Sequence, residues 1–255
     1  MRSGDPQEWY YPGGYIYTVG NLPPRDALWS HDGWELLFVF NPDDGGEARV
    51  QARFYYEDSP PRDAEWRAPP ATSILYGLFR PAFDWLTRGG NSPFGVRLRA
   101  DRPVYPHVTR AEYEPWTTMT PGAMFGVPPY QGPLTDETTW YYADGLVLDN
   151  PGEPLVQQEW ISILNPGEEA TPASVTFFLP DGPREHQLEV GGERLALVRV
   201  ETLPQVPKGV PYGVRVRAER PVVVQQVRRS LEQGGYPSTR AIFGTLAIPW
   251  PDAGA

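Results

Sequence analysis

The chain of 255 residues contains no cysteine, no long hydrophobic run and few basic residues. Without cysteine it has no disulfide framework, no thiolate nucleophile and no cysteine zinc site. The 22 Lys and Arg against 32 Asp and Glu give a net charge of −10, which argues against nucleic acid or an anionic membrane surface as a partner. The longest apolar run, residues 36–40, is too short to cross a bilayer. The first six residues lack the apolar stretch of a secretory signal, so we expect a cytoplasmic protein.

Proline, glycine and aromatic residues are abundant instead. The chain has 31 Pro and 26 Gly, and aromatic residues make up 13% of it, with nine Trp. So many aromatic rings argue against disorder, because their burial offsets the loss of chain entropy. Many short segments separated by Pro and Gly favour an all-β protein.

An internal repeat divides the chain. Residues 93–104 (PFGVRLRADRPV) recur as residues 211–222 (PYGVRVRAERPV), with three conservative differences. Further pairs follow in the same order: Trp9 and Trp140, Glu35 and Glu159, Asn41 and Asn165, Arg110 and Arg228, Phe125 and Phe243. The first copy has longer loops, around residues 15–34 and 77–92. We therefore predict two homologous domains, residues 8–130 and 139–250, joined by a polar linker of residues 131–138.

The periodicity within each copy is that of β-strands. Apolar residues alternate with Arg97 and Arg99 in the first copy and with Arg215 and Arg217 in the second. Segments 48–56, 174–179 and 195–200 are further strands of this kind, and Asn-Pro and Asp-Gly pairs predict turns between strands. Only residues 78–88 have a weak helical pattern, and Pro81 limits the length of any helix there. We predict six to eight strands per copy, arranged as two antiparallel β-sandwich (jelly-roll-like) domains in tandem.

The repeated motifs resemble those of a known family. Each unit opens with Trp-x-x-x-(Asp or Gly)-Gly and continues with a glutamate six positions before Asn-Pro. Pro-(Phe or Tyr)-Gly-Val-Arg and Pro-Val-x-x-(His or Gln)-x-x-Arg then follow. This order is similar to that of the sensory rhodopsin transducer family, soluble cytoplasmic partners of a cyanobacterial sensory rhodopsin, and the second copy matches more closely.

The resemblance implies a small β-sandwich that assembles as a homotetramer around a central axis and binds small molecules, with sugars as suspected ligands. A tandem copy then implies a homo-oligomer, in which a dimer of this chain forms a pseudo-tetramer of domains. A protein partner is a further expectation from the same source.

Three pairs of polar residues recur at equivalent positions and are candidate ligand-binding residues. They are Glu35 and Glu159 at strand starts, His107 and Gln225, and Arg110 and Arg228 near the end of the last long strand. Each has an ordinary structural alternative: a carboxylate bonded to backbone amides, a polar strand residue, or an arginine in an ion pair. On a regular strand His107 and Arg110 face opposite sides.

The long loop of the first copy adds two candidate ligand-binding residues, His31 and Trp34, and Trp29 lies beside them. Aromatic rings stack on sugars, although Trp in a sandwich more often lies in a core or interface. His186 is expected at the surface near a turn. The three histidines have no metal-ligand spacing, so we expect neither a metal nor another cofactor.

Three functions remain open. The first is a non-enzymatic small-molecule sensor, transducer or adaptor whose ligand is sugar-like. The second is an assembly scaffold built from the repeated domains. The third is a carbohydrate-active enzyme, which would need two carboxyl groups about 5–10 Å apart in one cleft. We expect no enzyme, because no nucleophile elbow, phosphate-binding loop or dinucleotide fingerprint is present.

Overall fold

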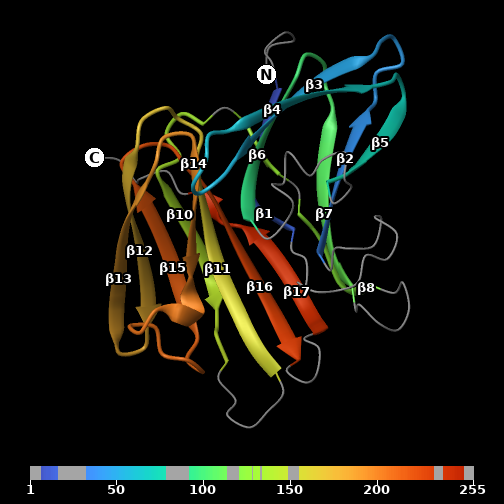
Figure 1. Cartoon of the computed structure of the whole chain (residues 1–255). Helices are drawn as coiled ribbons and strands as arrows, with labels where there is room; N and C mark the ends of the chain where they lie inside the picture. Colours follow the sequence, from blue (N-terminus) through green and yellow to red (C-terminus); the bar gives the residue numbers. More distant parts are fainter. Residues whose placement is uncertain are drawn as a thin grey trace.

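Two β-sandwiches stand side by side in the computed structural model (Figure 1). The structure describes residues 7–16, 33–78, 92–113, 121–127, 129–132, 134–148, 155–232 and 238–249. Within these ranges the sole helical turn is η2 (Val200–Thr202), and no helix is long and apolar enough to cross a membrane. The predicted all-β fold with two domains is therefore confirmed, while the exact domain and linker boundaries stay a prediction.

The first domain consists of two antiparallel sheets. Sheet I has the order β4-β3-β6-β1-β9 and sheet II the order β5-β2-β7-β8. The strands are β1 (Gln7–Ile16), β2 (Gly33–Asn41), β3 (Ala48–Tyr55), β4 (Arg62–Ala68), β5 (Thr72–Gly77), β6 (Ser92–Ala100), β7 (Tyr105–Tyr113), β8 (Pro121–Val127) and β9 (Tyr130–Gln131).

The second domain repeats this topology strand for strand. Sheet III has the order β13-β12-β15-β10-β18 and sheet IV the order β14-β11-β16-β17. The strands are β10 (Thr139–Gly145), β11 (Leu155–Asn165), β12 (Thr171–Leu179), β13 (Gly182–Val190), β14 (Arg194–Arg199), β15 (Tyr212–Ala218), β16 (Val223–Glu232), β17 (Ser238–Leu246) and β18 (Ile248–Pro249).

Both domains interrupt their first strand with the same β-bulge. The register shifts between Tyr11 and Gly14 in β1 and between Tyr142 and Gly145 in β10. A side chain at Gly14 would collide with the Phe94 ring, and one at Gly145 with the Tyr212 ring. The repeated glycine thus lets an aromatic residue of the neighbouring strand lie across the bulge.

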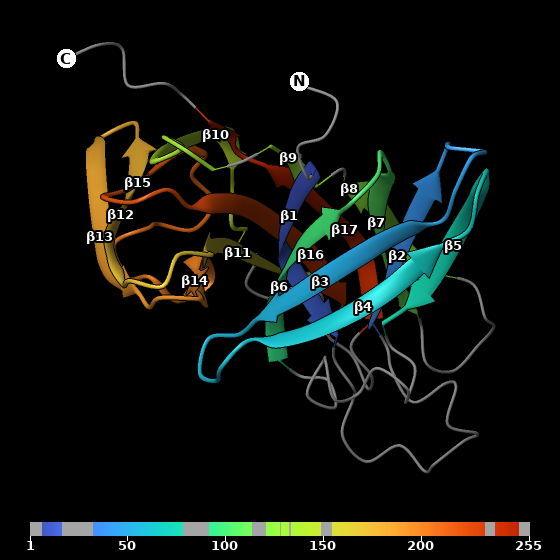
Figure 2. The same ribbon diagram turned by 90° about the horizontal axis from the view of Figure 1, so that it is seen from above.

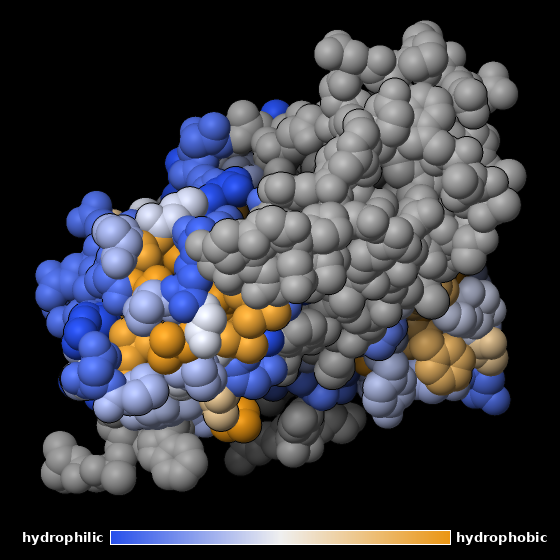
Figure 3. Space-filling model, turned by 90° about the horizontal axis from the view of Figure 1, so that it is seen from below, coloured by the Kyte–Doolittle hydropathy of each residue, from blue (hydrophilic) through white to orange (hydrophobic). Residues whose placement is uncertain are grey.

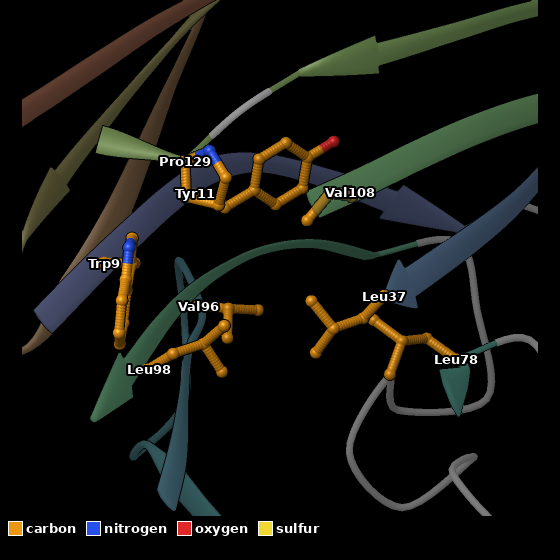
Figure 4. A pocket seen from close by; sticks show the side chains of 8 residues that line it. All are labelled: Trp9, Tyr11, Leu37, Leu78, Val96, Leu98, Val108 and Pro129. Atoms are coloured by element: carbon orange, nitrogen blue, oxygen red, sulfur yellow. The ribbon is translucent and has the colours of Figure 1, made fainter. Parts of the chain in front are cut away.

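Alternating side chains fill the space between the two sheets of each sandwich. In β3, apolar residues are buried at every second position, as the sequence pattern predicts. The first core contains a small, almost closed cavity of about 10 Å³. Figure 4 shows the apolar side chains around it, which include Leu37, Val96 and Val108. Such a volume holds one water molecule at most, so it is no ligand site.

Two buried asparagines close equivalent turns. The side-chain amide of Asn41 donates to the carbonyls of Gly46, Ala68 and Pro69. That of Asn165 donates to the carbonyls of Glu169, Val190 and Gly191 at 2.8–3.3 Å. The sequence predicts turns here, and the structure adds that each asparagine ties three segments together.

The two domains pack against each other through different faces. Strands β1 and β6 of sheet I lie against β11, β14 and β16 of sheet IV, as the view from above shows (Figure 2), and the edge strand β8 of sheet II lies beside β17 of sheet IV. Two residues of the first domain, Tyr10 and Tyr55, are buried within the core cluster of the second. Backbone contact reinforces the interface, because the Leu195 amide donates to the Tyr56 carbonyl at 3.1 Å.

Two smaller predictions have different outcomes. His186 lies within strand β13, paired with Val175 and half-buried, so its expected place near a turn was wrong. The strand simply continues beyond the Asp181-Gly182 turn. The weakly helical segment 78–88 lies outside the described residues except for Leu78, which is in a turn.

Candidate functional site

Each domain encloses a carboxylate paired with an arginine from the neighbouring strand. In the first domain, Glu35 of β2 lies opposite Arg110 of β7 in the strand register. Their closest atoms, Glu35 Oε1 and Arg110 Nη1, are 3.4 Å apart, and both side chains are completely buried. The Tyr11 hydroxyl donates to Oε2 of Glu35 at 3.2 Å. Two charges held away from water in this way neutralise each other.

The second domain contributes the cover of this site. The Trp160 ring lies 5.6 Å from the Arg110 guanidinium carbon, in the position of a cation–π contact. The side chain of Gln225 lies against Gly13, where a Cβ atom would be only 2.5 Å from its amide. The Gln225 amide also lies close enough to the Tyr11 hydroxyl to lower its pKa, but it does not form a regular hydrogen bond with it. The site in the first domain is therefore sealed at the domain interface.

The second domain repeats the pair with tighter geometry. Nε of Arg228 donates to Oε2 of Glu159 at 2.8 Å, and Nη2 lies 2.7 Å from the same oxygen. Oε1 of Glu159 accepts a 2.7 Å bond from the Tyr212 hydroxyl. The Arg228 guanidinium also donates to the Asp144 carbonyl. Glu159 is fully buried, whereas 11% of the Arg228 side chain is exposed, so this site stays open at the arginine.

Two polar side chains of the second site, Tyr142 and Gln226, are buried without a hydrogen bond to any described residue. The Tyr142 hydroxyl and both amide atoms of Gln226 are buried without a hydrogen-bond partner among the described residues. Tyr142 corresponds to Tyr11, and Gln226 to Val108. The second domain thus buries polar groups that make no hydrogen bond with the described residues, at positions equivalent to Tyr11 and Val108.

Burial and the enclosed carboxylates govern the ionisation of the tyrosines. Burial, assisted by the charge of Glu35, raises the pKa of Tyr11 well above its usual value. Burial and then Glu159 raise the pKa of Tyr142 and Tyr212 in the same way. These hydroxyls therefore remain protonated at physiological pH, and those of Tyr11 and Tyr212 can donate to Glu35 and Glu159.

The remaining candidates from the sequence do not join these sites. His107 is exposed on the outer face of sheet II, on the opposite side of β7 from Arg110, as strand alternation predicts. Its counterpart Gln225 is buried at the domain interface. His31 and Trp29 lie outside the described residues. Trp34 belongs to β2, paired with Ala111, and its side chain lies outside the described part.

A separate groove of about 510 Å³ opens where the two domains meet. The first domain contributes Tyr10, Arg97 and acidic Glu8; the second contributes the turn of residues 165–169 and Arg220. Arg99 pairs with Glu8, and Arg220 with Glu169. Arg97 has no hydrogen bond or ion pair with any described residue. A groove of this size and polarity suits a small polar molecule.

Sequence reasoning missed Tyr212, Trp160 and the role of Arg97. The first repeat has Phe94 in place of Tyr212 and Leu36 in place of Trp160, so neither recurs as a pair. From the sequence, Arg97 is expected on the solvent-exposed face of its strand. It lines a groove only because the second domain lies beside that face. Among the described residues no group of three or more His, Asp or Glu side chains could hold a metal ion.

Comparison with known proteins gives one family match. Residues 135–246 match the family model described as Anabaena sensory rhodopsin transducer. Two of the similar solved structures each have 25% sequence identity to this chain. A Thermotoga maritima 1070 crystal structure covers 45% of this chain and 96% of its own, with a TM-score of 0.38. The Anabaena sensory rhodopsin transducer covers 37% and 91%, with a TM-score of 0.33. No curated protein matches.

Proposed function

We propose, from the match of residues 135–246 to the family model described as Anabaena sensory rhodopsin transducer, that this chain is a non-enzymatic binding protein of the transducer type. It acts in the cytoplasm as a sensor or adaptor, works as a homo-oligomer, and takes a small polar, sugar-like ligand in the groove between its domains. Ligand binding in this groove would change the junction between the domains, and a protein partner would detect that change.

The guanidinium of Arg97, which has no hydrogen bond or ion pair with the part of the chain that the structure describes, is the observation that supports the ligand site. Arginine offers five donors in a rigid fork and usually has a carboxylate or carbonyl partner when half-buried. The counterpart in the second domain, Arg215, has a side-chain partner of another kind, since its Nη2 donates to the Thr176 hydroxyl at 3.2 Å. In the groove, Arg97 stands next to the Arg99–Glu8 pair, so donors and acceptors are both within reach of a ligand with several hydroxyl groups.

The buried carboxylates have a different part in this proposal. Glu35 and Glu159 are completely buried and paired, so they hold the sandwich walls in position instead of contacting the ligand. A hydrolytic reaction would need two carboxyl groups around one accessible cleft, and two of the groove's three acids, Glu8 and Glu169, already pair with arginines.

Isothermal titration calorimetry with a panel of mono- and disaccharides, uronic acids and polyols tests the ligand site. We expect one class to bind the wild type and to bind Arg97→Ala at least tenfold more weakly. The matched control is Arg67→Ala, because Arg67 is 71% exposed on β4 and lies outside the groove. If no member of the panel binds, or if Arg97→Ala binds as well as the wild type, the proposed ligand site is wrong.

A scaffold role is the second candidate function. Five large apolar side chains are exposed among the described residues: Phe40, Leu75, Tyr105, Phe178 and Ile248. Figure 3 shows from below that apolar surface is exposed both on the second domain, at the left, and at the right-hand edge, where the first domain lies. Exposed apolar groups of this size favour contact with another protein surface.

A further inference from the structure

Arg97 lines two grooves at once. Besides the groove between the domains, a second groove of about 480 Å³ runs over β3, β4 and β6 of sheet I. Its lining includes Arg53, Asp63 and Glu65, and it shares Arg97 and Arg99 with the first groove. The two grooves therefore meet at these arginines, and a ligand in either groove lies beside them.

Arg97 faces a side chain of the same charge. Arg53 of β3 lies directly opposite Arg97 of β6 in the strand register, so both side chains stand on one face of the sheet. Arg99 follows two positions further along the same face. Like charges directly opposite each other destabilise a sheet. This corner thus concentrates positive charge on a chain whose net charge is −10.

The acids around this corner are engaged with other arginines. Glu8 pairs with Arg99, Glu65 with Arg49, and Asp63 with Arg53. The ion pairs of Arg53 are long, because its Nε lies 3.5 Å from Asp63 and its Nη1 lies 3.4 Å from Glu193 of the second domain. That Nε is buried and makes no hydrogen bond with the described residues. Both facing arginines therefore have N–H donors to spare.

The repeat shows how the equivalent arginine is held in the second domain. Nη2 of Arg215 donates to the Thr176 hydroxyl, and its guanidinium carbon lies 5.7 Å from the centre of the Phe178 ring. Thr176 is the residue opposite Arg215 in the strand register. A hydroxyl acceptor and an aromatic face from the neighbouring strand thus fix this side chain.

The first domain has replaced both of these contacts. Arg53 stands in the place of Thr176, and a guanidinium has no acceptor to offer Arg97. Tyr55 stands in the place of Phe178, but its ring is fully buried in the core cluster of the second domain. The arginine is therefore kept in the first domain without the partners that hold it in the second.

The Tyr55 hydroxyl adds an unsatisfied polar group beneath this corner. It is buried and has no hydrogen-bond partner in the described part of the chain. Burial raises the pKa of Tyr55 to about 12, and among its charged neighbours Arg97 opposes that rise most, followed by Arg53. The hydroxyl therefore lies near the two facing guanidinium groups.

We propose that the ligand of the groove carries an oxyanion, a phosphate or carboxylate group, that binds between Arg97 and Arg53 where the two grooves meet. This rests on the proposed function and narrows its sugar-like ligand to an acidic or phosphorylated sugar. The planar forks of two arginines match the oxygens of such a group. The anion offsets the repulsion between the facing arginines, and the hydroxylated part of the ligand extends into the groove between the domains.

Isothermal titration calorimetry with matched ligands tests the anion site. The panel contains neutral sugars, each beside its uronic acid and its phosphate ester, and inorganic phosphate as the bare anion. We expect one acidic or phosphorylated member to bind the wild type at least thirtyfold more tightly than its neutral parent. The two acidic arms show whether carboxylate or phosphate is preferred, and inorganic phosphate alone should bind more weakly than the ester.

Arg53→Thr places the residue of the second domain opposite Arg97. We expect it to weaken binding of the acidic ligand at least tenfold and to leave the affinity of the neutral parent unchanged. Arg67→Thr is the matched control, because Arg67 is 71% exposed on β4 and lines neither groove. It should bind the acidic ligand like the wild type.

Glu193→Gln separates the anion site from the domain junction, because Arg53→Thr also removes the ion pair with Glu193. Glu193→Gln loses the same ion pair and keeps both arginines, so it should bind the acidic ligand at least as tightly as the wild type. If it weakens binding as much as Arg53→Thr does, the loss comes from the junction and the anion site is wrong.

Failure of the two proposals gives different results. If neutral sugars bind through Arg97 as tightly as their acidic counterparts, the anion site is wrong and the proposed ligand site stands. If acidic ligands bind but Arg53→Thr leaves their affinity unchanged, the anion site is likewise overturned. If inorganic phosphate binds as tightly as the sugar phosphates, the anion site stands and the sugar-like ligand is wrong. If no member of the panel binds, both proposals are wrong.

Discussion

The hydroxyl of Tyr212 donates a 2.7 Å hydrogen bond to Oε1 of Glu159 inside the second domain, where the first domain has Phe94. The two aromatic rings lie across equivalent bulge glycines, so the phenyl group alone is enough for packing. The hydroxyl is therefore an addition that serves the carboxylate.

Tyr212→Phe should keep the packing and lose the hydrogen bond. A bond to a buried carboxylate contributes about 2 kcal/mol, and we expect the free energy of unfolding to fall by about that amount. Glu159→Gln should cost about 3 kcal/mol, because it leaves the largely buried Arg228 without a counter-charge. Denaturant unfolding measures both.

The double variant Tyr212→Phe/Glu159→Gln supplies the control. If the hydroxyl acts through the carboxylate, the two losses are not additive, and the coupling is about 1 kcal/mol or more. Additive losses would show that the hydroxyl contributes independently of Glu159.

Gln226→Leu should stabilise the protein. Both amide atoms of Gln226 are buried without a partner among the described residues, and the first domain has Val108 at this position. Removing an unsatisfied buried amide and keeping the volume should raise the free energy of unfolding by about 1 kcal/mol. Gln225→Leu is the contrast: its amide atoms also lack a regular hydrogen bond among the described residues, but they lie against Gly13 and the Tyr11 hydroxyl, and we expect this variant to be neutral or destabilising. A loss of stability in Gln226→Leu would contradict the reading of this amide as unsatisfied.

Much of the fold follows from local sequence pattern. The alternation around Arg97 and Arg99 predicts strand β6, and its repetition around Arg215 and Arg217 predicts β15. The recurrence of Glu35 with Arg110 and of Glu159 with Arg228 marks two pairs that the register then brings opposite each other. Alternation and recurrence succeed here because each depends on neighbours within one domain.

What the sequence does not reveal depends on how the domains meet. Tyr55 and Phe178 have equivalent places in their strands, yet the first is buried and the second is 44% exposed. The difference arises because the second domain covers one sheet face and not its repeat. Likewise, Gln225 and His107 form an equivalent pair in the sequence, but only the contact between domains decides that Gln225 is buried.

Asn165→Asp should be strongly destabilising although it preserves shape. The asparagine amide donates to three backbone carbonyls, while its Oδ1 accepts the Gly167 amide at 3.0 Å. Aspartate keeps the acceptor but brings negative charge to the three carbonyls and leaves them unpaired. We expect a loss of about 3 kcal/mol or more by denaturant unfolding. Asn41→Asp should behave alike, because its amide has the same pattern of carbonyl partners. A loss under 1 kcal/mol in both variants would mean that these bonds do not hold the turns.

Glu201→Gln should stabilise the protein at neutral pH and not in acid. Burial raises the pKa of Glu201 above its usual value, outweighing the backbone bonds it accepts and the nearby Arg199. A raised pKa in the folded state means that folding takes up protons, so the contribution of this carboxyl is most favourable at low pH. It weakens as the pH rises through the raised pKa.

Glutamine carries no charge and can still accept the Glu159 amide that now bonds Oε2 of Glu201 at 3.3 Å. We therefore expect Glu201→Gln to unfold at higher urea concentration than the wild type at pH 7 and at about the same concentration at pH 4. Glu185→Gln, whose side chain is exposed on β13, is the control and should show no comparable change between the two pH values. A Glu201→Gln variant less stable than the wild type at pH 7 would show that the backbone bonds and Arg199 outweigh burial, which reverses the direction of the pKa shift.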